Sequence, residues 1–190
     1  MNSQKKRLLG LTPAELKDIC SSLSMPAFTA RQIAQWLYEK HATSIDEMTN
    51  ISLQNRRRLA EHYEVGLRQH IDSQHSKDGT IKYLFPVSCD HVATYPGREG
   101  SGNTRPERED GDGKDAGQEA EERFVETVFI PDHDRATLCV SCQVGCKMNC
   151  LFCQTGKQGW HGNLTAADIL NQVCALPEAD RLTNIVFMGQ

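Results

Sequence analysis

Apolar side chains recur at helical spacing along three stretches of the first 70 residues. In the second stretch, Trp36 and Leu37 lie three and four positions after Ile33, which is the spacing of one helix face. The first stretch follows Thr12 and Pro13, with a glutamate at the third helical position, a combination that satisfies the free N–H groups of a first turn. The pattern predicts three helices, which begin at Thr12, Thr29 and Ser52.

The third of these helices is expected to bury Leu53 and Leu59, and it carries three consecutive arginines, Arg56 to Arg58. Residues 1–70 hold ten Lys and Arg against seven Asp and Glu, so this region is basic. A basic surface suits a phosphate backbone, although an ordinary solvated helix face explains the arginines equally well. We expect residues 1–70, the head, to form a helical accessory domain.

The spacing of apolar residues changes after the head. The segments GTIKYLFPV (79–87) and FVETVFIP (124–131) are rich in β-branched and aromatic residues and are flanked by turn formers, so they are predicted to pair as two strands. The segment between them, residues 89–123, is dense in glycine and charge and cannot bury enough apolar surface to become ordered. We therefore assign residues 71–130 to a β-hairpin that carries a disordered acidic insertion.

The remaining segments alternate between strand and helix patterns. RATLCVSCQ (135–143) indicates a strand, TAADILNQVCAL (165–176) a helix and LTNIVFMG (182–189) a second strand. This order is typical of an α/β protein with a parallel sheet, and we expect residues 131–190 to be the start of a TIM-like barrel. Because the chain stops at Gln190, directly after a strand, we expect the barrel to be truncated.

The cysteines are clustered: five of the eight lie between Cys139 and Cys153. The sequence shows no signal peptide and no run of about 18 apolar residues, so we expect a cytoplasmic protein without a membrane partner. Thiols stay reduced in the cytoplasm, and the cluster therefore indicates metal or redox chemistry and not a disulfide framework.

Cys146, Cys150 and Cys153 follow the first strand of the predicted barrel, where such folds place their chemistry. Three thiolates leave one iron of a [4Fe–4S] cluster open for a substrate. A structural zinc site made of Cys139-x2-Cys142 and Cys150-x2-Cys153 is the alternative, and it leaves Cys146 unexplained.

The cysteine spacing, with the aromatic Phe152 before the third cysteine, resembles the signature of the radical S-adenosylmethionine (SAM) superfamily. Residues 124–189 closely resemble the bacterial dual-specificity radical SAM methyltransferases, which modify C2 of adenine in 23S ribosomal RNA and in transfer RNA. The resemblance implies an RNA-binding head, a [4Fe–4S] cluster with S-adenosylmethionine as cofactors, and a flavodoxin-like electron donor. It also implies that the three cluster ligands are Cys146, Cys150 and Cys153.

The resemblance also gives roles to two further residues. Adenine C2 is not nucleophilic, so the family methylates it through a radical on a methylated protein cysteine. Glu126 matches the family's proton acceptor, and Cys139 resembles the cysteine that resolves the covalent adduct by forming a disulfide. The family's Gly-Glu-Pro segment and its methyl-bearing cysteine are not in this sequence, so we expect an N-terminal part that is inactive alone. The alternatives are an adenine-C8 methyltransferase and a zinc-stabilised RNA-binding module without redox chemistry.

Overall fold

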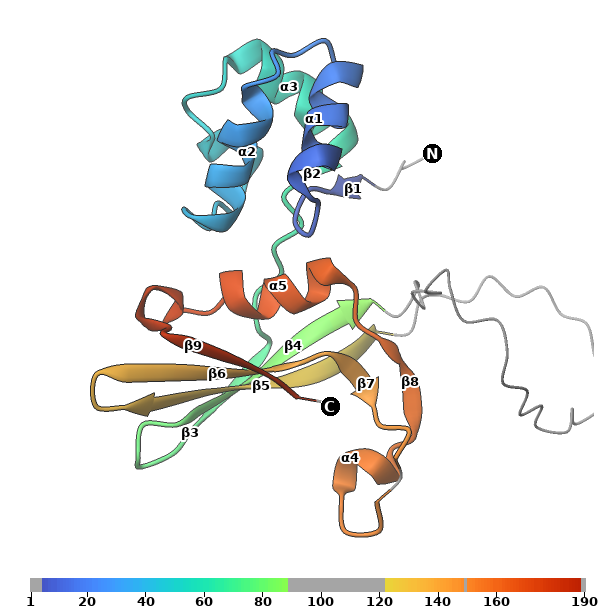
Figure 1. Ribbon diagram of the computed structural model, residues 1–190, viewed down its shortest axis with the longest axis vertical. Helices are drawn as coiled ribbons and strands as arrows, with labels where there is room; N and C mark the ends of the chain where they lie inside the picture. The colour runs from blue at the N-terminus through green and yellow to red at the C-terminus, as the bar shows by residue number, and fades with distance from the viewer. Residues whose placement is uncertain (1–4, 89–121, 149, 189–190) are drawn as a thin grey trace, which may run out of the picture.

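The computed structural model describes residues 5–88, 122–148 and 150–188 of the 190-residue chain (Figure 1). Two hydrophobic cores lie in this part of the chain, one inside the head and one between a β-sheet and a helix. The predicted acidic insertion and its Cys89 lie outside the described residues. The last two of the residues assigned to it, 122 and 123, belong instead to a strand.

The head contains the three predicted helices. Its elements are β1 (Lys6–Arg7), α1 (Pro13–Ser22), α2 (Thr29–Tyr38), the 3-10 helix η1 (Ile45–Glu47), α3 (Leu53–His62) and β2 (Tyr63–Glu64). The side chain of Thr12 accepts the Glu15 N–H while the Glu15 carboxylate accepts the Thr12 N–H, so the predicted cap of α1 is confirmed. Ile33, Leu37 and Leu59 are buried in the head core.

Two details of the helix pattern were wrong. Thr29 does not cap α2, because the backbone is already helical at Phe28 and Thr29 lies inside the helix, where it is buried. Leu53 was expected to face inward with Leu59, but its side chain is 53% exposed. The two leucines are six positions apart, which at 3.6 residues per turn places them on different faces of α3.

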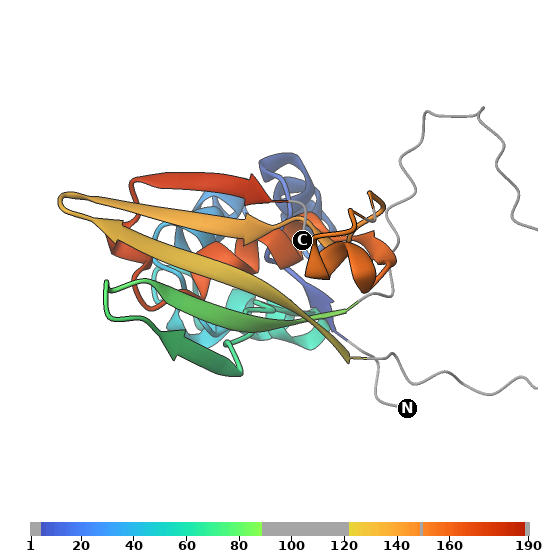
Figure 2. The same cartoon turned by 90° about the horizontal axis from the view of Figure 1, so that it is seen from below.

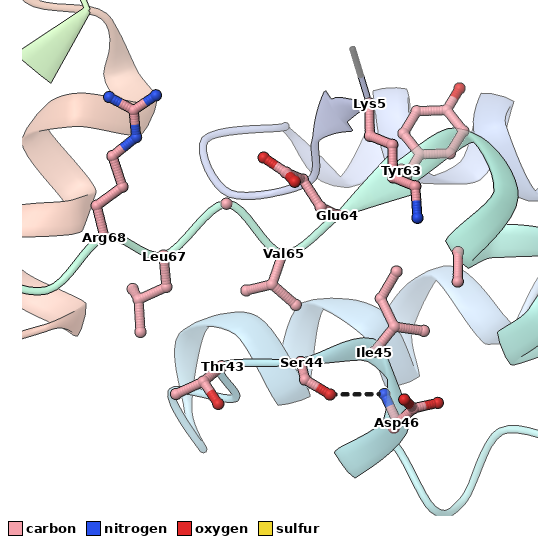
Figure 3. A pocket seen from close by; sticks show the side chains of 12 residues that line it. Lys5, Thr43, Ser44, Ile45, Asp46, Tyr63, Glu64, Val65, Leu67 and Arg68 are labelled. Atoms are coloured by element: carbon pink, nitrogen blue, oxygen red, sulfur yellow. Dashed lines mark hydrogen bonds between the residues drawn. The ribbon is translucent and has the colours of Figure 1, made fainter. Parts of the chain in front are cut away.

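A hollow of about 330 Å³ opens in the head beside η1 and the segment that follows β2 (Figure 3). Lys5 and Arg68 bring positive charge to its lining, and Asp46 and Glu64 bring negative charge. Because the two signs are balanced, the charge of the lining favours neither an anionic nor a cationic ligand.

The second core belongs to a five-stranded sheet. Its strands are β3 (Asp72–His75), β4 (Ile81–Ser88), β5 (Glu122–Asp132), β6 (Arg135–Ser141) and β9 (Asn184–Met188), in the order β3-β4-β5-β6-β9. The pairs are antiparallel except that β6 and β9 are parallel. The predicted β4–β5 hairpin and the strand–helix–strand unit are therefore both present. They share one sheet, since β5 runs across the boundary that the sequence placed between residues 130 and 131.

Helix α5 (Ala166–Cys174) covers one face of this sheet, as Figure 1 shows. Along β5 the side chains of Val125, Thr127 and Phe129 are buried on that face, while Glu126 and Val128 lie on the other. In Figure 2 this second face is turned toward the viewer, and no described element crosses it. The apolar side chains of β9 are between 37% and 65% exposed.

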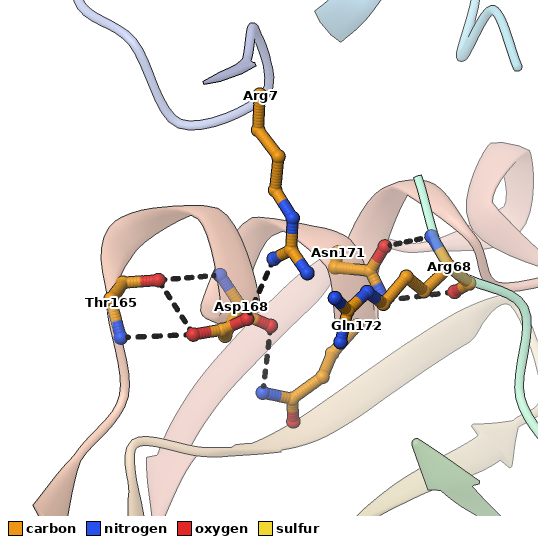
Figure 4. A network of polar contacts seen from close by, with 6 residues as sticks. All are labelled: Arg7, Arg68, Thr165, Asp168, Asn171 and Gln172. Carbon is orange, nitrogen blue, oxygen red and sulfur yellow. Dashed lines mark hydrogen bonds and ion pairs between the residues drawn. The ribbon is translucent and has the colours of Figure 1, made fainter. Parts of the chain in front are cut away.

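The head lies against the outer side of α5 (Figure 4). Arg7 Nη1 is 3.1 Å from Asp168 Oδ1, and the backbone of Arg68 exchanges two hydrogen bonds with the Asn171 amide. Gly10 has a φ of +93° and packs so closely on α5 that an added Cβ would lie 2.6 Å from the Ala167 nitrogen. Within the described ranges, no helix has the length and apolar character needed to span a bilayer.

Candidate functional site

The predicted cluster ligands lie on one loop, residues 146–158, which we call the cysteine loop. Two short strands hold its ends together: β7 (Gln143–Gly145) pairs antiparallel with β8 (Trp160–Asn163). The Cys146 N–H donates to the Gly159 carbonyl at 3.1 Å, and Lys147 Nζ lies 3.8 Å from the centre of the Trp160 ring. The loop therefore leaves the sheet just past the carboxyl end of β6 with both of its ends fixed.

The base of the loop depends on a glycine. Gly145 has a φ of +70°, and a Cβ added to it would lie 1.7 Å from the Gly159 carbonyl oxygen. No other residue fits there without separating β7 from β8. Gly159 also has a positive φ, of +78°, but an added Cβ would meet no atom within 4 Å. Strands β7 and β8 were not predicted from the sequence. The two glycines that flank the loop, Gly145 and Gly159, were the only feature of the sequence that indicated them.

The three thiols differ in what surrounds them. The Cys153 N–H donates to the Cys150 carbonyl at 3.0 Å, which closes a turn between these ligands, and Met148 N lies 3.5 Å from Cys146 Sγ. Cys153 precedes the short helix α4 (Gln154–Lys157), and the backbone N–H of Gly156 lowers the pKa of its thiol. Two of the three sulfurs thus accept backbone N–H groups, which stabilise thiolate charge.

This donor set suits an iron–sulfur cluster, since its usual ligands are cysteine thiolates and hydrogen bonds to sulfur tune it. In the ranges that the structure describes, no three His, Cys, Asp or Glu side chains lie close enough together to hold one metal ion. The three thiols are therefore brought to one loop but not gathered into a ligand shell.

Glu126 and Cys139 lie together on the face of the sheet opposite α5. Cys139 pairs with Val128, and Glu126 is two residues from Val128 along β5, so the three side chains share that face. Lys82 Nζ donates to Glu126 Oε1 at 2.9 Å, and both side chains are 38% exposed. Sequence reasoning missed Lys82, because only the register between β4 and β5 brings it beside Glu126.

The remaining described cysteines have different surroundings. Cys142 Sγ lies 3.0 Å from the Met188 carbonyl oxygen, at the junction of β6 and β9. Cys20 and Cys174 are buried, and burial raises the pKa of Cys174 to about 11. Thiols held protonated in this way are poor nucleophiles and poor metal ligands.

Comparison with known proteins gives a family match for the head and relatives for nearly the whole chain. Residues 6–65 match the family model of the ribosomal RNA large subunit methyltransferase N-terminal domain. Over 185 residues the chain is 50% identical to a probable dual-specificity RNA methyltransferase RlmN of Bacteroides fragilis, covering 97% of this chain and 44% of that protein. It is 40% identical over 186 residues to a dual-specificity RNA methyltransferase RlmN of Halorhodospira halophila, covering 96% and 43%.

A solved structure shares the fold. The crystal structure of a radical SAM methyltransferase from Sphaerobacter thermophilus aligns with a TM-score of 0.73 at 33% identity, over 98% of this chain and 47% of that one. This likeness confirms the predicted α/β class as part of a radical SAM fold. The chain spans a little under half the length of the relatives that it matches.

Proposed function

We propose that this chain, which is related over nearly all its length to the N-terminal part of the dual-specificity RNA methyltransferases, belongs to an enzyme that methylates C2 of adenine in 23S ribosomal and transfer RNA. The observation that carries the proposal is the place of the cysteine loop. Three thiols lie just past the carboxyl end of β6, and Glu126 and Cys139 share the open face of the same sheet.

Cys146, Cys150 and Cys153 would hold the [4Fe–4S] cluster. When bound, the cluster with S-adenosylmethionine supplies the carbon radical that methylation of a non-nucleophilic ring carbon requires. The turn between Cys150 and Cys153 and the backbone N–H groups directed at two sulfurs support this assignment, because they favour thiolates at fixed positions. The fixed ends of the loop would keep the ligands at the end of the sheet where Glu126 lies.

Glu126 would take up the proton that leaves the adenine ring, since an ionised carboxylate is a suitable general base. The hydrogen bond from Lys82 would orient its carboxylate. Cys139 would attack the sulfur of the thioether that joins protein to RNA: the S–S bond of a disulfide forms, the C–S bond breaks, and the released carbon takes up a proton to become the new methyl group. Its half-buried position beside Val128, on the same face as Glu126, is consistent with a reaction at that face.

The family resemblance also supports the proposed partners. Ribosomal and transfer RNA would bind the basic head, and a flavodoxin-like protein would donate the electron that the cluster needs. The enzyme would act in the cytoplasm, where these RNAs and reduced thiols are found.

The experiment that tests the function is deletion of the gene that encodes this chain, followed by mass spectrometry of nucleosides from 23S ribosomal and transfer RNA. We expect 2-methyladenosine to disappear, the gene to restore it, and the same gene with Glu126→Gln to fail. Loss of 8-methyladenosine would instead support a C8 methyltransferase. If neither nucleoside changed and the purified protein held zinc without iron, an RNA-binding module would replace the enzyme.

For RNA binding by the head, we expect Arg56 and Arg57 of α3 to contribute unequally. Arg57 is exposed, whereas Arg56 Nη1 donates to the Asp46 carbonyl and so ties α3 to η1. Arg57→Ala is expected to weaken binding to unmodified transfer RNA and to reduce the slope of log K against log salt by about 0.7 to 0.9, the value for one phosphate contact. Titrations at several salt concentrations measure this slope.

The matched control is Arg56→Ala, which removes the donor to the Asp46 carbonyl. It is expected to lower the melting temperature of the head more than Arg57→Ala does. An unchanged salt slope in Arg57→Ala would assign that arginine to a solvated surface without RNA contact.

A further inference from the structure

Gln172, on the side of α5 that faces the sheet, is a polar residue with no exposed surface. Its Oε1 accepts the Ser141 N–H at 2.8 Å and the Thr127 hydroxyl at 2.7 Å. Its Nε2 donates to the Ser141 carbonyl at 2.9 Å and lies 3.3 Å from the Asp168 carbonyl of its own helix. Figure 4 shows the side chain leaving α5 on the side away from Arg7 and the head.

The Gln172 amide binds both backbone groups of Ser141, the last residue of β6, as a neighbouring strand would. The pairing of β5 with β6 runs from Asp132 and Arg135 only as far as Val128 and Cys139. Beyond that point, the Ser141 hydroxyl donates to the Glu126 carbonyl at 2.6 Å. Side chains thus join the two strands where the backbone ladder ends.

The need to fill space does not explain why residue 172 is a glutamine. Its neighbours Ile169 and Val173 on α5 pack against the apolar core of the sheet, and leucine or methionine would fill the same space. Burying an amide is unfavourable unless its donors and acceptor are bound. Here the acceptor and the donor both bind one residue, Ser141, at the strand end that leads to the cysteine loop.

We propose that Gln172 is a positioning residue for the reaction. It fixes the end of β6, from which the cysteine loop leaves, and through the Ser141 hydroxyl it fixes the backbone of Glu126. One side chain thereby sets the place of the proton acceptor relative to the cluster ligands. This inference rests on the proposed roles of Glu126 and of Cys146, Cys150 and Cys153.

The first test needs no cluster and no activity. In Gln172→Met, which keeps the volume but loses the hydrogen bonds, hydrogen exchange measured by NMR is expected to be about tenfold faster or more at the Ser141 amide. The control Cys174→Ala perturbs the packing of the same helix without touching Ser141, and this amide should keep its protection there. Equal exchange rates in Gln172→Met and in the unaltered protein would overturn the inference.

The second test uses the complete enzyme. Ser141→Ala removes only the hydroxyl that binds the Glu126 carbonyl, so it is a milder change than Gln172→Met. Both variants are expected to lower kcat about tenfold or more while the KM for RNA and the cluster absorbance stay unchanged, because a small misplacement of a catalytic group is costly. Cys174→Ala should retain kcat.

Two outcomes separate this inference from the proposed function. If both variants lose activity only in proportion to their loss of thermal stability, Gln172 is structural and the inference is wrong. If the unaltered enzyme forms no methyladenosine, the proposed function fails and the reaction role of Gln172 fails with it. The exchange rates would still show whether Gln172 holds the end of β6.

Discussion

Replacing any one of Cys146, Cys150 and Cys153 with alanine is expected to abolish binding of the iron–sulfur cluster. Three thiolates already leave one iron without a protein ligand, so the loss of one more leaves two irons open to solvent. After anaerobic reconstitution, we expect about four irons per chain in the unaltered protein and almost none in each variant.

The control for this experiment is Cys174→Ala. Burial raises the pKa of the Cys174 thiol to about 11, so this thiol stays protonated near neutral pH and should contribute nothing to cluster binding. Iron and sulfide analysis together with the visible absorption of the cluster measures loading. A normal cluster spectrum in any of the three ligand variants would show that the assignment of that ligand is wrong.

Gly145→Ala is expected to damage the site almost as severely as loss of a ligand. The left-handed backbone at Gly145 costs a non-glycine residue about 1 to 2 kcal/mol. The new Cβ would also overlap the Gly159 carbonyl oxygen, from which it would be only 1.7 Å away. Strands β7 and β8 would have to separate, and the Cys146 N–H would lose its acceptor. We expect cluster loading to fall to about a tenth or less, because the ligands lose their fixed positions.

Gly159→Ala provides a matched control for this change. The backbone at residue 159 is also left-handed, with a φ of +78°, but a Cβ added there would point into open space. This variant should therefore lose about 1 to 2 kcal/mol of local stability and keep most of the cluster. Parallel measurements of iron content and melting temperature compare the two variants. Equal losses in both would show that backbone strain, and not the overlap between β7 and β8, accounts for the effect.

Much of the fold was predictable because its signals are local. The capping residues at Thr12 and Thr165 act within four residues, and both caps form as the sequence indicates. The β-branched and aromatic residues of segments 79–87 and 124–131, with turn formers around them, predicted β4 and β5 as a pair. Leu53 was wrongly predicted to be buried with Leu59 because the helical period was not applied. Residues six positions apart do not share a helix face.

The candidate site was predictable only in part. The spacing of three cysteines predicted a role for the cysteine loop, and the resemblance to a known family predicted roles for Glu126 and Cys139. No local pattern marked Lys82 or Gln172, since a lysine on a strand and a glutamine on a helix are usually solvated. Their contacts, with Glu126 and Ser141 respectively, join residues that are 44 and 31 positions apart in the chain.

The sequence by itself determined where α1, α3 and α5 begin, that β4, β5, β6 and β9 are strands, and which thiols are close together, because each of these follows from neighbours a few residues apart. Tertiary structure decided which residues share a face, how the cysteine loop is held, and what surrounds Glu126. The physical reason is that register and packing depend on distant segments: Gly145 must be glycine because of Gly159, and the end of β6 is fixed by a side chain from α5.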